Sequence, residues 1–216
     1  MELRFLNYLQ FRWAHVLELT IEHALVTITT VAIATVIGVA VGVATYRTDR
    51  ARQLVLGIAS VFLTIPSLAL FGLFIGLIGL GIVPVIIALV MYSLLPILAN
   101  TIVGLRSVDP AIVESAQGIG MPRNARLLRI ELPLAWPVIL TGIRVSTLLT
   151  IGIAAIGAYI RGPGLGQDIF TGLARIGSPQ AINYVLGGVL GIVLLAILFD
   201  LLFVLVNRIT TSRGIQ

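Results

Sequence analysis

The sequence predicts an all-α integral membrane protein with about five transmembrane helices, and two observations lead to that fold class. The first is composition: of 216 residues, 58% are hydrophobic and only 11% are charged, and the mean hydropathy is +1.10. A water-soluble domain of this length needs far more polar surface. The second is that five apolar stretches each reach about 20 residues, the length of a helix that crosses a bilayer. We expect a single domain.

The five predicted spans follow one another with short connections, except for a longer charged loop in the middle. Pro66 lies in the second span and Pro96 in the third, where we expect each to kink its helix. The spans are expected at residues 24–46, 54–78, 85–105, 134–160 and 182–206. The transmembrane domain then covers residues 24–207, and residues 208–216 form a tail.

Residues 1–23 precede the first span and mix charged with aromatic side chains, among them Arg12, Glu22, Tyr8 and Trp13. Because this segment has no continuous apolar run, it does not resemble a cleavable signal peptide. Trp and Tyr favour the headgroup level of a bilayer. We therefore predict an extracytoplasmic segment whose helix lies at the membrane interface.

Several residue types are missing, and each absence excludes a class of chemistry. There is no Cys, which excludes disulfides, thiol nucleophiles and thiolate metal sites. All fourteen basic residues are Arg, so the chain lacks the Lys that a phosphate-binding P-loop places on the nucleotide. His15 and His23 stand without the Glu of a zinc-protease motif. We expect no metal site and no catalytic residue on this chain.

The Arg residues predict the orientation of the spans. Nine of them fall in the loops that share one side, and four fall on the other side. Cytoplasmic loops carry the excess of basic residues. The nine-Arg side is therefore expected in the cytoplasm, which places the N-terminus outside and the C-terminus inside. The nine residues are Arg47, Arg50, Arg52, Arg106, Arg123, Arg126, Arg129, Arg208 and Arg213.

The longest of these loops, residues 106–133, is named the central loop. Asp109-Pro110 predicts the start of a helix, with Asp as the N-cap and Pro at the first position. About two helical turns follow, until Gly118 and Gly120 end them, and a second amphipathic stretch leads to Pro133. A short helix with an apolar strip and an acid fits a groove on another protein. An interfacial helix that only caps the bundle is the alternative.

The central loop resembles the EAA signature of binding-protein-dependent ABC importer permeases. That pattern asks for Glu-Ala-Ala, three residues, Gly, nine residues, and Ile-x-Leu-Pro, and this chain has "ESA", then Gly120, then "IELP". Ser115 replaces the central Ala and is small enough to preserve a close approach. The matching residues are Glu114, Ala116, Gly120, Ile130, Leu132 and Pro133. Residues 104–173, with "VDP" before the signature and "GPGLGQDI" after the fourth span, are similar to permeases of osmoprotectant importers.

This resemblance implies a type I ABC importer permease fold in the cell membrane, with the short helix of the central loop as a cytoplasmic coupling helix. It implies a transport subunit rather than an enzyme, for solutes such as glycine betaine, choline, carnitine or proline. Implied partners are a second permease chain, identical or paralogous, two cytoplasmic ATPase subunits that hold ATP and Mg, and an extracytoplasmic binding protein. A permease for amino acids such as methionine is the alternative, and an ATP-independent secondary transporter is disfavoured because no inverted repeat is visible.

Two charges, Arg144 and Asp200, lie within predicted spans. At 1.5 Å per residue, Arg144 lies ~17 Å from Pro133 and Asp200 lies ~12 Å from Arg208, so the two depths are comparable. Charges inside a bilayer usually pair or face a cavity. We predict a buried ion pair between the fourth and fifth spans, or a place along the pathway; the alternative is that each reaches the headgroups.

The stretch "RGPGLGQD" after the fourth span predicts a tight extracellular turn. Its candidate residues are Gly162, Gly164, Gly166 and Asp168, which we expect to contact the binding protein or to gate the pathway. A quaternary ammonium group prefers aromatic rings, but the chain is only 7% aromatic and shows no clustered set. We therefore expect any aromatic cage to belong to the binding protein.

Overall fold

The computed structural model describes residues 2–211, and within that range the chain is helical with no strand. Met1 and residues 212–216, which include Arg213 and most of the predicted tail, lie outside the described part. In chain order the elements are α1 (Glu2–Thr45), α2 (Asp49–Thr64), α3 (Ser67–Ile78), α4 (Ile82–Arg106), α5 (Pro110–Gly118), α6 (Arg123–Arg126), the π-helical turn η1 (Leu127–Glu131), α7 (Leu132–Gly157), the 3₁₀ turn η2 (Ala158–Ile160), α8 (Gly166–Ala174) and α9 (Ala181–Thr210).

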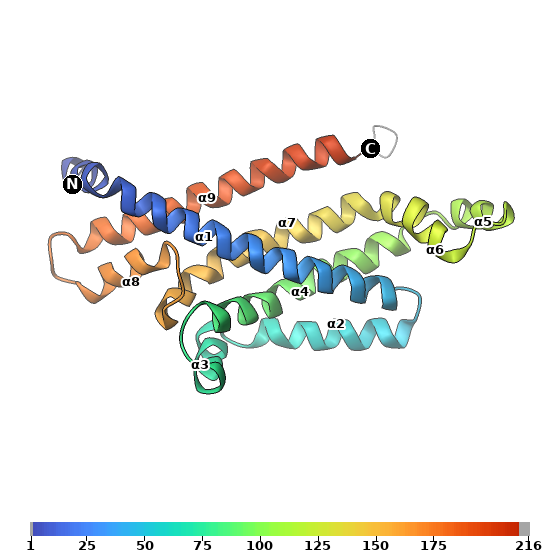
Figure 1. Ribbon diagram of the computed structural model, residues 1–216, viewed down its shortest axis with the longest axis horizontal. Coiled ribbons are helices and arrows are strands. Elements are labelled where there is room, and N and C mark those ends of the chain that lie inside the picture. Colours follow the sequence, from blue (N-terminus) through green and yellow to red (C-terminus); the bar gives the residue numbers. More distant parts are fainter. Residues whose placement is uncertain (1, 212–216) are drawn as a thin grey trace.

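The long helices run along a common axis and form an elongated bundle (Figure 1). Four helical segments are long and apolar enough to cross a membrane, and the bent pair α2–α3 makes a fifth if it counts as one span. The predicted all-α membrane fold is confirmed. Short helices mark the two ends of the bundle, with α5 and α6 at one end and α8 at the other, and the start of α1 and the end of α9 also lie toward opposite ends (Figure 1).

The first helix is longer than predicted. The interfacial segment and the first span form one continuous helix, α1, of 44 residues, with no break near residue 24. At 1.5 Å per residue α1 is about 66 Å long, roughly twice the hydrocarbon thickness of a bilayer. A large part of α1 therefore extends beyond the apolar layer, and its first turns reach α8 and α9.

The second span differs from the prediction of one kinked helix. Its two halves, α2 and α3, are bent by 96° at the break between them. Pro66 offers no N–H to continue the helix and pushes Ile65 into an extended conformation, with ψ of 126°. The hydroxyl of Tyr92 donates to the released carbonyl of Ile65 at 2.7 Å. Pro96, in contrast, lies inside α4 without ending it.

The core forms where α4 packs against α1 and α7. Close approach explains two glycines: a Cβ at Gly142 would lie 2.6 Å from the carbonyl oxygen of Pro96, and one at Gly42 would lie 2.6 Å from Cγ2 of Thr101. Buried hydroxyls join α4 to α7, with Oγ of Ser93 2.8 Å from Oγ1 of Thr150. This closely packed centre separates two ends of the bundle with different chemistry.

Candidate functional site

The helix predicted in the central loop is present as α5. The carboxylate of Asp109 accepts a hydrogen bond from the backbone N–H of Ala111 at 2.8 Å, and Pro110 occupies the first position. The helix ends after Gly118, and Gly120 adopts φ of 82°, a left-handed conformation that favours glycine. Capping at both ends therefore defines α5 as a short rigid unit before the chain turns into α6.

The surface of α5 is mostly open. Glu114 and Ser115 are exposed, whereas Ala116 is buried against the chain. Two apolar residues of the predicted strip, Ile112 and Ile119, are 43% and 80% exposed. The helix projects from the end of the bundle (Figure 1). A capped helix that presents an acid beside uncovered apolar side chains is suited to a groove on another chain.

Glu131 connects the central loop to the rest of the bundle, and the sequence analysis did not single it out. Its side chain is 3% exposed and lies 2.8 Å from the guanidinium of Arg47. The hydroxyl of Tyr46 donates to it at 2.6 Å, and Arg126 completes the cluster as an ion pair at 3.5 Å. Burial, together with the hydrogen bond to Glu131, raises the pKa of the Tyr46 hydroxyl above its ordinary value. That hydroxyl therefore remains a neutral donor.

This cluster of Glu131, Tyr46, Arg47 and Arg126 is named the loop joint. Tyr46 and Arg47 follow α1 directly, while Arg126 and Glu131 belong to α6 and η1. Arg126 also donates to the side chain of Gln117, on α5, at 3.4 Å. The loop joint thus ties α5 to the α1–α2 corner through side chains, while η1 continues directly into α7 through the backbone. Of the residues matched to the EAA pattern, Ile130, Leu132 and Pro133 lie next to this joint along the chain.

The structure brings Arg144 and Asp200 together as a two-pronged ion pair between α7 and α9. Nε of Arg144 lies 2.6 Å from Oδ1 of Asp200, and Nη2 lies 2.8 Å from Oδ2. Their side chains are 41% and 34% exposed, so the pair lies at the bundle surface rather than in its core. In an apolar surrounding each charge is the natural partner of the other. A second tie between these helices is the hydrogen bond from Trp136 to Thr210, at 2.8 Å.

The stretch predicted as an extracellular turn packs inward. Gly162, Gly164, Gly166 and Asp168 are all buried within the chain. The backbone N–H of Gly164 donates to the carboxylate of Glu22, on α1, at 3.1 Å. A Cβ at Gly166 would lie 2.0 Å from the carbonyl oxygen of Ala155, so only glycine fits there. The turn leads into α8, a helix that the sequence analysis did not predict.

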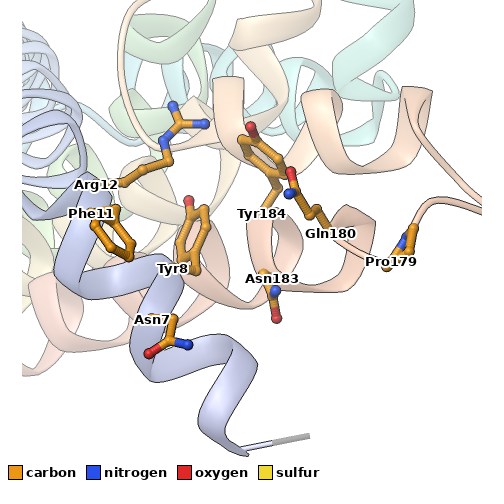
Figure 2. A pocket seen from close by; sticks show the side chains of 8 residues that line it. All are labelled: Asn7, Tyr8, Phe11, Arg12, Pro179, Gln180, Asn183 and Tyr184. Atoms are coloured by element: carbon orange, nitrogen blue, oxygen red, sulfur yellow. The ribbon is translucent and has the colours of Figure 1, made fainter.

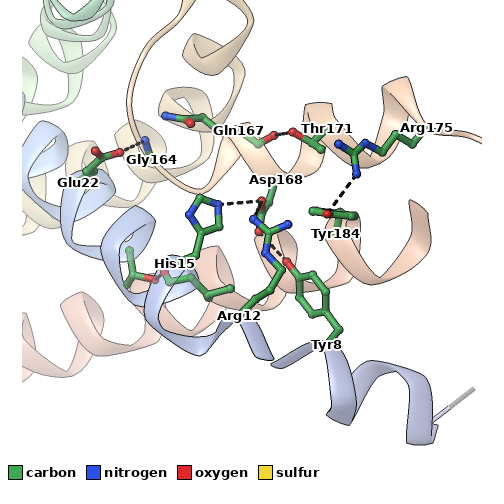
Figure 3. Close-up of polar contacts among 12 residues, drawn as sticks. Tyr8, Arg12, His15, Glu22, Gly164, Gln167, Asp168, Thr171, Arg175 and Tyr184 are labelled. Carbon is green, nitrogen blue, oxygen red and sulfur yellow. Dashed lines mark hydrogen bonds and ion pairs between the residues drawn. The ribbon is translucent and has the colours of Figure 1, made fainter. Parts of the chain in front are cut away.

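Asp168 holds the first turns of α1 against α8 (Figure 3). Its carboxylate accepts a hydrogen bond from Tyr8 at 2.6 Å, and Arg12 and His15 lie 3.7 and 3.5 Å from it. Its main structural contacts are therefore internal. A contact between these four turn residues and a binding protein, or a gating role, stays a prediction.

The structure thus combines a bundle of helices long and apolar enough to cross a membrane with a capped helix exposed at one end. Residues 13–211 match the family model described as binding-protein-dependent transport system inner membrane component. The chain belongs to this family, which confirms the expectation drawn from the EAA-like residues. It is therefore a membrane component of a transport system and not an enzyme by itself.

Relatives in sequence agree with this assignment, and a solved structure shares the fold. The chain is 39% identical to the choline transport system permease protein OpuBB of Bacillus subtilis (strain 168), over 97% of this chain and 95% of that protein. It is 38% identical to the osmoprotectant import permease protein OsmW of Salmonella typhimurium (strain LT2), over 98% of this chain and 99% of that protein. An inward-facing structure of the MetNI methionine ABC transporter covers 91% of this chain and 96% of its own, with a TM-score of 0.81 at 20% identity.

Proposed function

We propose that this chain forms the translocation pathway of an ATP-driven importer of compatible solutes such as glycine betaine, choline, carnitine or proline. Support for this solute class comes from relatives named as choline, glycine betaine/carnitine/choline and osmoprotectant permeases, at 38–39% identity over nearly the whole chain. The likeness to the methionine transporter is 20% in sequence and supports the fold alone. An amino-acid permease is therefore the weaker alternative.

The observation that carries the coupling part of this proposal is the exposed, capped helix α5 with Glu114 on its open surface. In this account α5 docks as the coupling helix into a cleft of a cytoplasmic ATPase subunit, and Glu114 faces a basic residue there. ATP and Mg are held by that partner, which agrees with the absence of Lys from this chain. Two ATPase chains, a second permease chain and an extracytoplasmic binding protein complete the unit.

The same account gives the orientation. The end of the bundle that carries α5 faces the cytoplasm, and the end that carries α8 faces outward. The Arg excess on the α5 side supports this orientation. The start of α1 and the end of α9 lie toward opposite ends of the bundle (Figure 1). A chain that starts and ends on opposite sides of a membrane crosses it an odd number of times. This favours counting α2–α3 as one span, which gives five.

Movement of α5 has two routes into the spans. One is the continuous backbone from α6 through η1 into α7. The other is the loop joint, where Glu131 holds Tyr46 and Arg47 at the corner between α1 and α2. Closure of the ATPase dimer would then rotate α7 and α1 together, as alternating access about a central pathway requires.

Purification of the tagged chain from its own membranes in mild detergent, followed by mass spectrometry of the bound proteins, tests this proposal. The expected result is a P-loop ATPase and an extracytoplasmic binding protein, together with uptake of labelled glycine betaine in cells that carry the complete system. Methionine uptake without betaine uptake would favour the alternative substrate class. Recovery of the chain alone, under conditions that preserve other complexes of this type, would contradict the coupling role.

A further inference from the structure

A pocket of about 400 Å³ opens between the first turns of α1 and the start of α9, at the end of the bundle opposite α5 (Figures 1 and 2). Its α1 side carries Tyr8, Phe11 and Arg12, and its α9 side carries Asn183 and Tyr184. This volume suits a small organic solute. Two aromatic side chains of α1 and one of α9, far away in the sequence, therefore line the same pocket as a guanidinium group.

Arg12 has hydrogen-bonding capacity to spare at this pocket. Its guanidinium carbon lies 4.6 Å from the ring centre of Tyr184, and its nearest contact with the carboxylate of Asp168 is 3.7 Å, which is longer than a hydrogen bond. Its side chain is 30% exposed. None of the hydrogen bonds found among residues 2–211 uses Arg12, whose planar fork of five donors matches a carboxylate.

The other walls supply an amide and an aromatic face. Asn183 is only 5% exposed, yet its side chain makes no hydrogen bond within the described part of the chain. Its amide is not among the polar groups of residues 2–211 that are closed off without a partner, so it is accessible from the pocket that it lines. Phe11 is 83% exposed, so its ring is open to a ligand at the rim. Aromatic faces attract methylated ammonium groups, which lack N–H donors and are weakly hydrated.

We propose that this pocket binds a small betaine-like zwitterion, with its carboxylate on Arg12 and its methylated ammonium against Phe11. The inference rests on the proposed function, which supplies the solute class and the outward position of this end. The pocket then receives solute released by the binding protein, before the solute enters the space between the spans. Its weak affinity, expected for so open a site, allows the solute to leave inward.

Equilibrium binding of radiolabelled glycine betaine tests this site on the permease purified with its partner chains. The complex is placed in nanodiscs of phosphatidylglycerol and phosphatidylethanolamine, which have no choline headgroups to compete, and the binding protein is left out. Phe11→Ala should weaken binding about threefold, the value of one exposed cation–aromatic contact. Arg12→Lys retains the charge but loses the fork, and should weaken binding about tenfold. Trp13→Ala, an exposed aromatic of the same helix that does not line the pocket, should leave binding unchanged.

Choline provides the second arm, because it carries the methylated ammonium without the carboxylate. It should bind about tenfold more weakly than glycine betaine at this pocket. The inference would be overturned if choline and glycine betaine bound equally well, or if Phe11→Ala and Trp13→Ala weakened binding equally. It would also be overturned if the wild-type complex bound no glycine betaine. Uptake of betaine by the complete wild-type system distinguishes the failures: retained uptake without pocket binding refutes this site alone, whereas loss of both refutes the proposed function.

Discussion

Replacing Glu131 with Ala removes the carboxylate at the centre of the loop joint. Taking one partner from a buried ion pair leaves the other charge uncompensated and costs about 3–5 kcal/mol. The partner Arg47 is 34% exposed and can be rehydrated, whereas Arg126 is nearly buried. We therefore expect the low end of that range, about 3 kcal/mol. Glu131→Gln retains an acceptor for the hydroxyl of Tyr46, so it should lose about half as much folding free energy as Glu131→Ala, because only the charge is removed.

The functional consequence follows from the same contacts. With the joint broken, α5 remains attached through the α7 backbone but no longer moves the α1–α2 corner. Reconstituted Glu131→Ala should hydrolyse ATP at near wild-type rates while moving several-fold less solute per ATP. The assay is the ratio of labelled betaine uptake to phosphate release in proteoliposomes, with unfolding midpoints measured in detergent.

Asp49→Asn is the matched control for Glu131. Asp49 lies at the same end of the bundle and pairs with Arg52 and Arg106 at 3.1 and 3.0 Å. Its side chain is 67% exposed, so its neutralisation should change stability by less than about 1 kcal/mol and leave coupling intact. If Glu131→Ala behaved like this control in both assays, the loop joint would have no role in transmission.

Three further changes test other parts of the account. Glu114→Arg should preserve membrane insertion, measured by surface labelling, but abolish the stimulation of solute uptake by ATP. Normal uptake by this variant would show that Glu114 does not contact the ATPase. Gly120→Val forces a β-branched residue to φ of 82°, and should cost about 1–2 kcal/mol and uncouple uptake in the same assay. Neutralising either Arg144 or Asp200 should lower the thermal unfolding midpoint in detergent, because the remaining charge loses its partner. Exchange of the two residues should restore part of that loss; no recovery would exclude direct pairing as the source of the effect.

The features that sequence could predict are those governed by local rules. Hydropathy located the long apolar helices because a bilayer demands about 20 apolar residues in a row. The start and end of α5 followed from Asp109, Pro110 and Gly120, since capping depends on neighbours within a few residues. The EAA-like spacing then identified the family, which the comparison over residues 13–211 confirmed.

The features that sequence did not predict depend on contacts between distant residues. Pro66 signals a disturbance of its helix, but the 96° bend depends on how α3 packs and on the hydrogen bond from Tyr92. Glu131 occupies the unspecified position of the Ile-x-Leu-Pro pattern, so nothing local distinguishes it from a solvent-exposed acid. The short glycine-rich approach to α8 resembles an exposed turn in the sequence, but contacts with Glu22 of α1 and Ala155 of α7 bury it in the fold.

The aromatic pocket shows the same limit. Tyr8 and Tyr184 lie near opposite ends of the chain, yet their ring centres are 5.4 Å apart. Composition alone suggested no cage on this chain. The continuity of α1 through its first turns is what brings the two rings together.

Site-directed cross-linking from α5 tests the central claim most directly. Because the chain has no Cys, Glu114→Cys introduces a single thiol on the exposed side of α5, and Phe11→Cys introduces one at the opposite end as a control. In native membranes, the account predicts that a short bifunctional reagent joins the thiol at position 114 to a chain bearing a P-loop, and that the thiol at position 11 gives no such product. An ATPase cross-link from position 11, or none from position 114 in an actively transporting complex, would contradict the account.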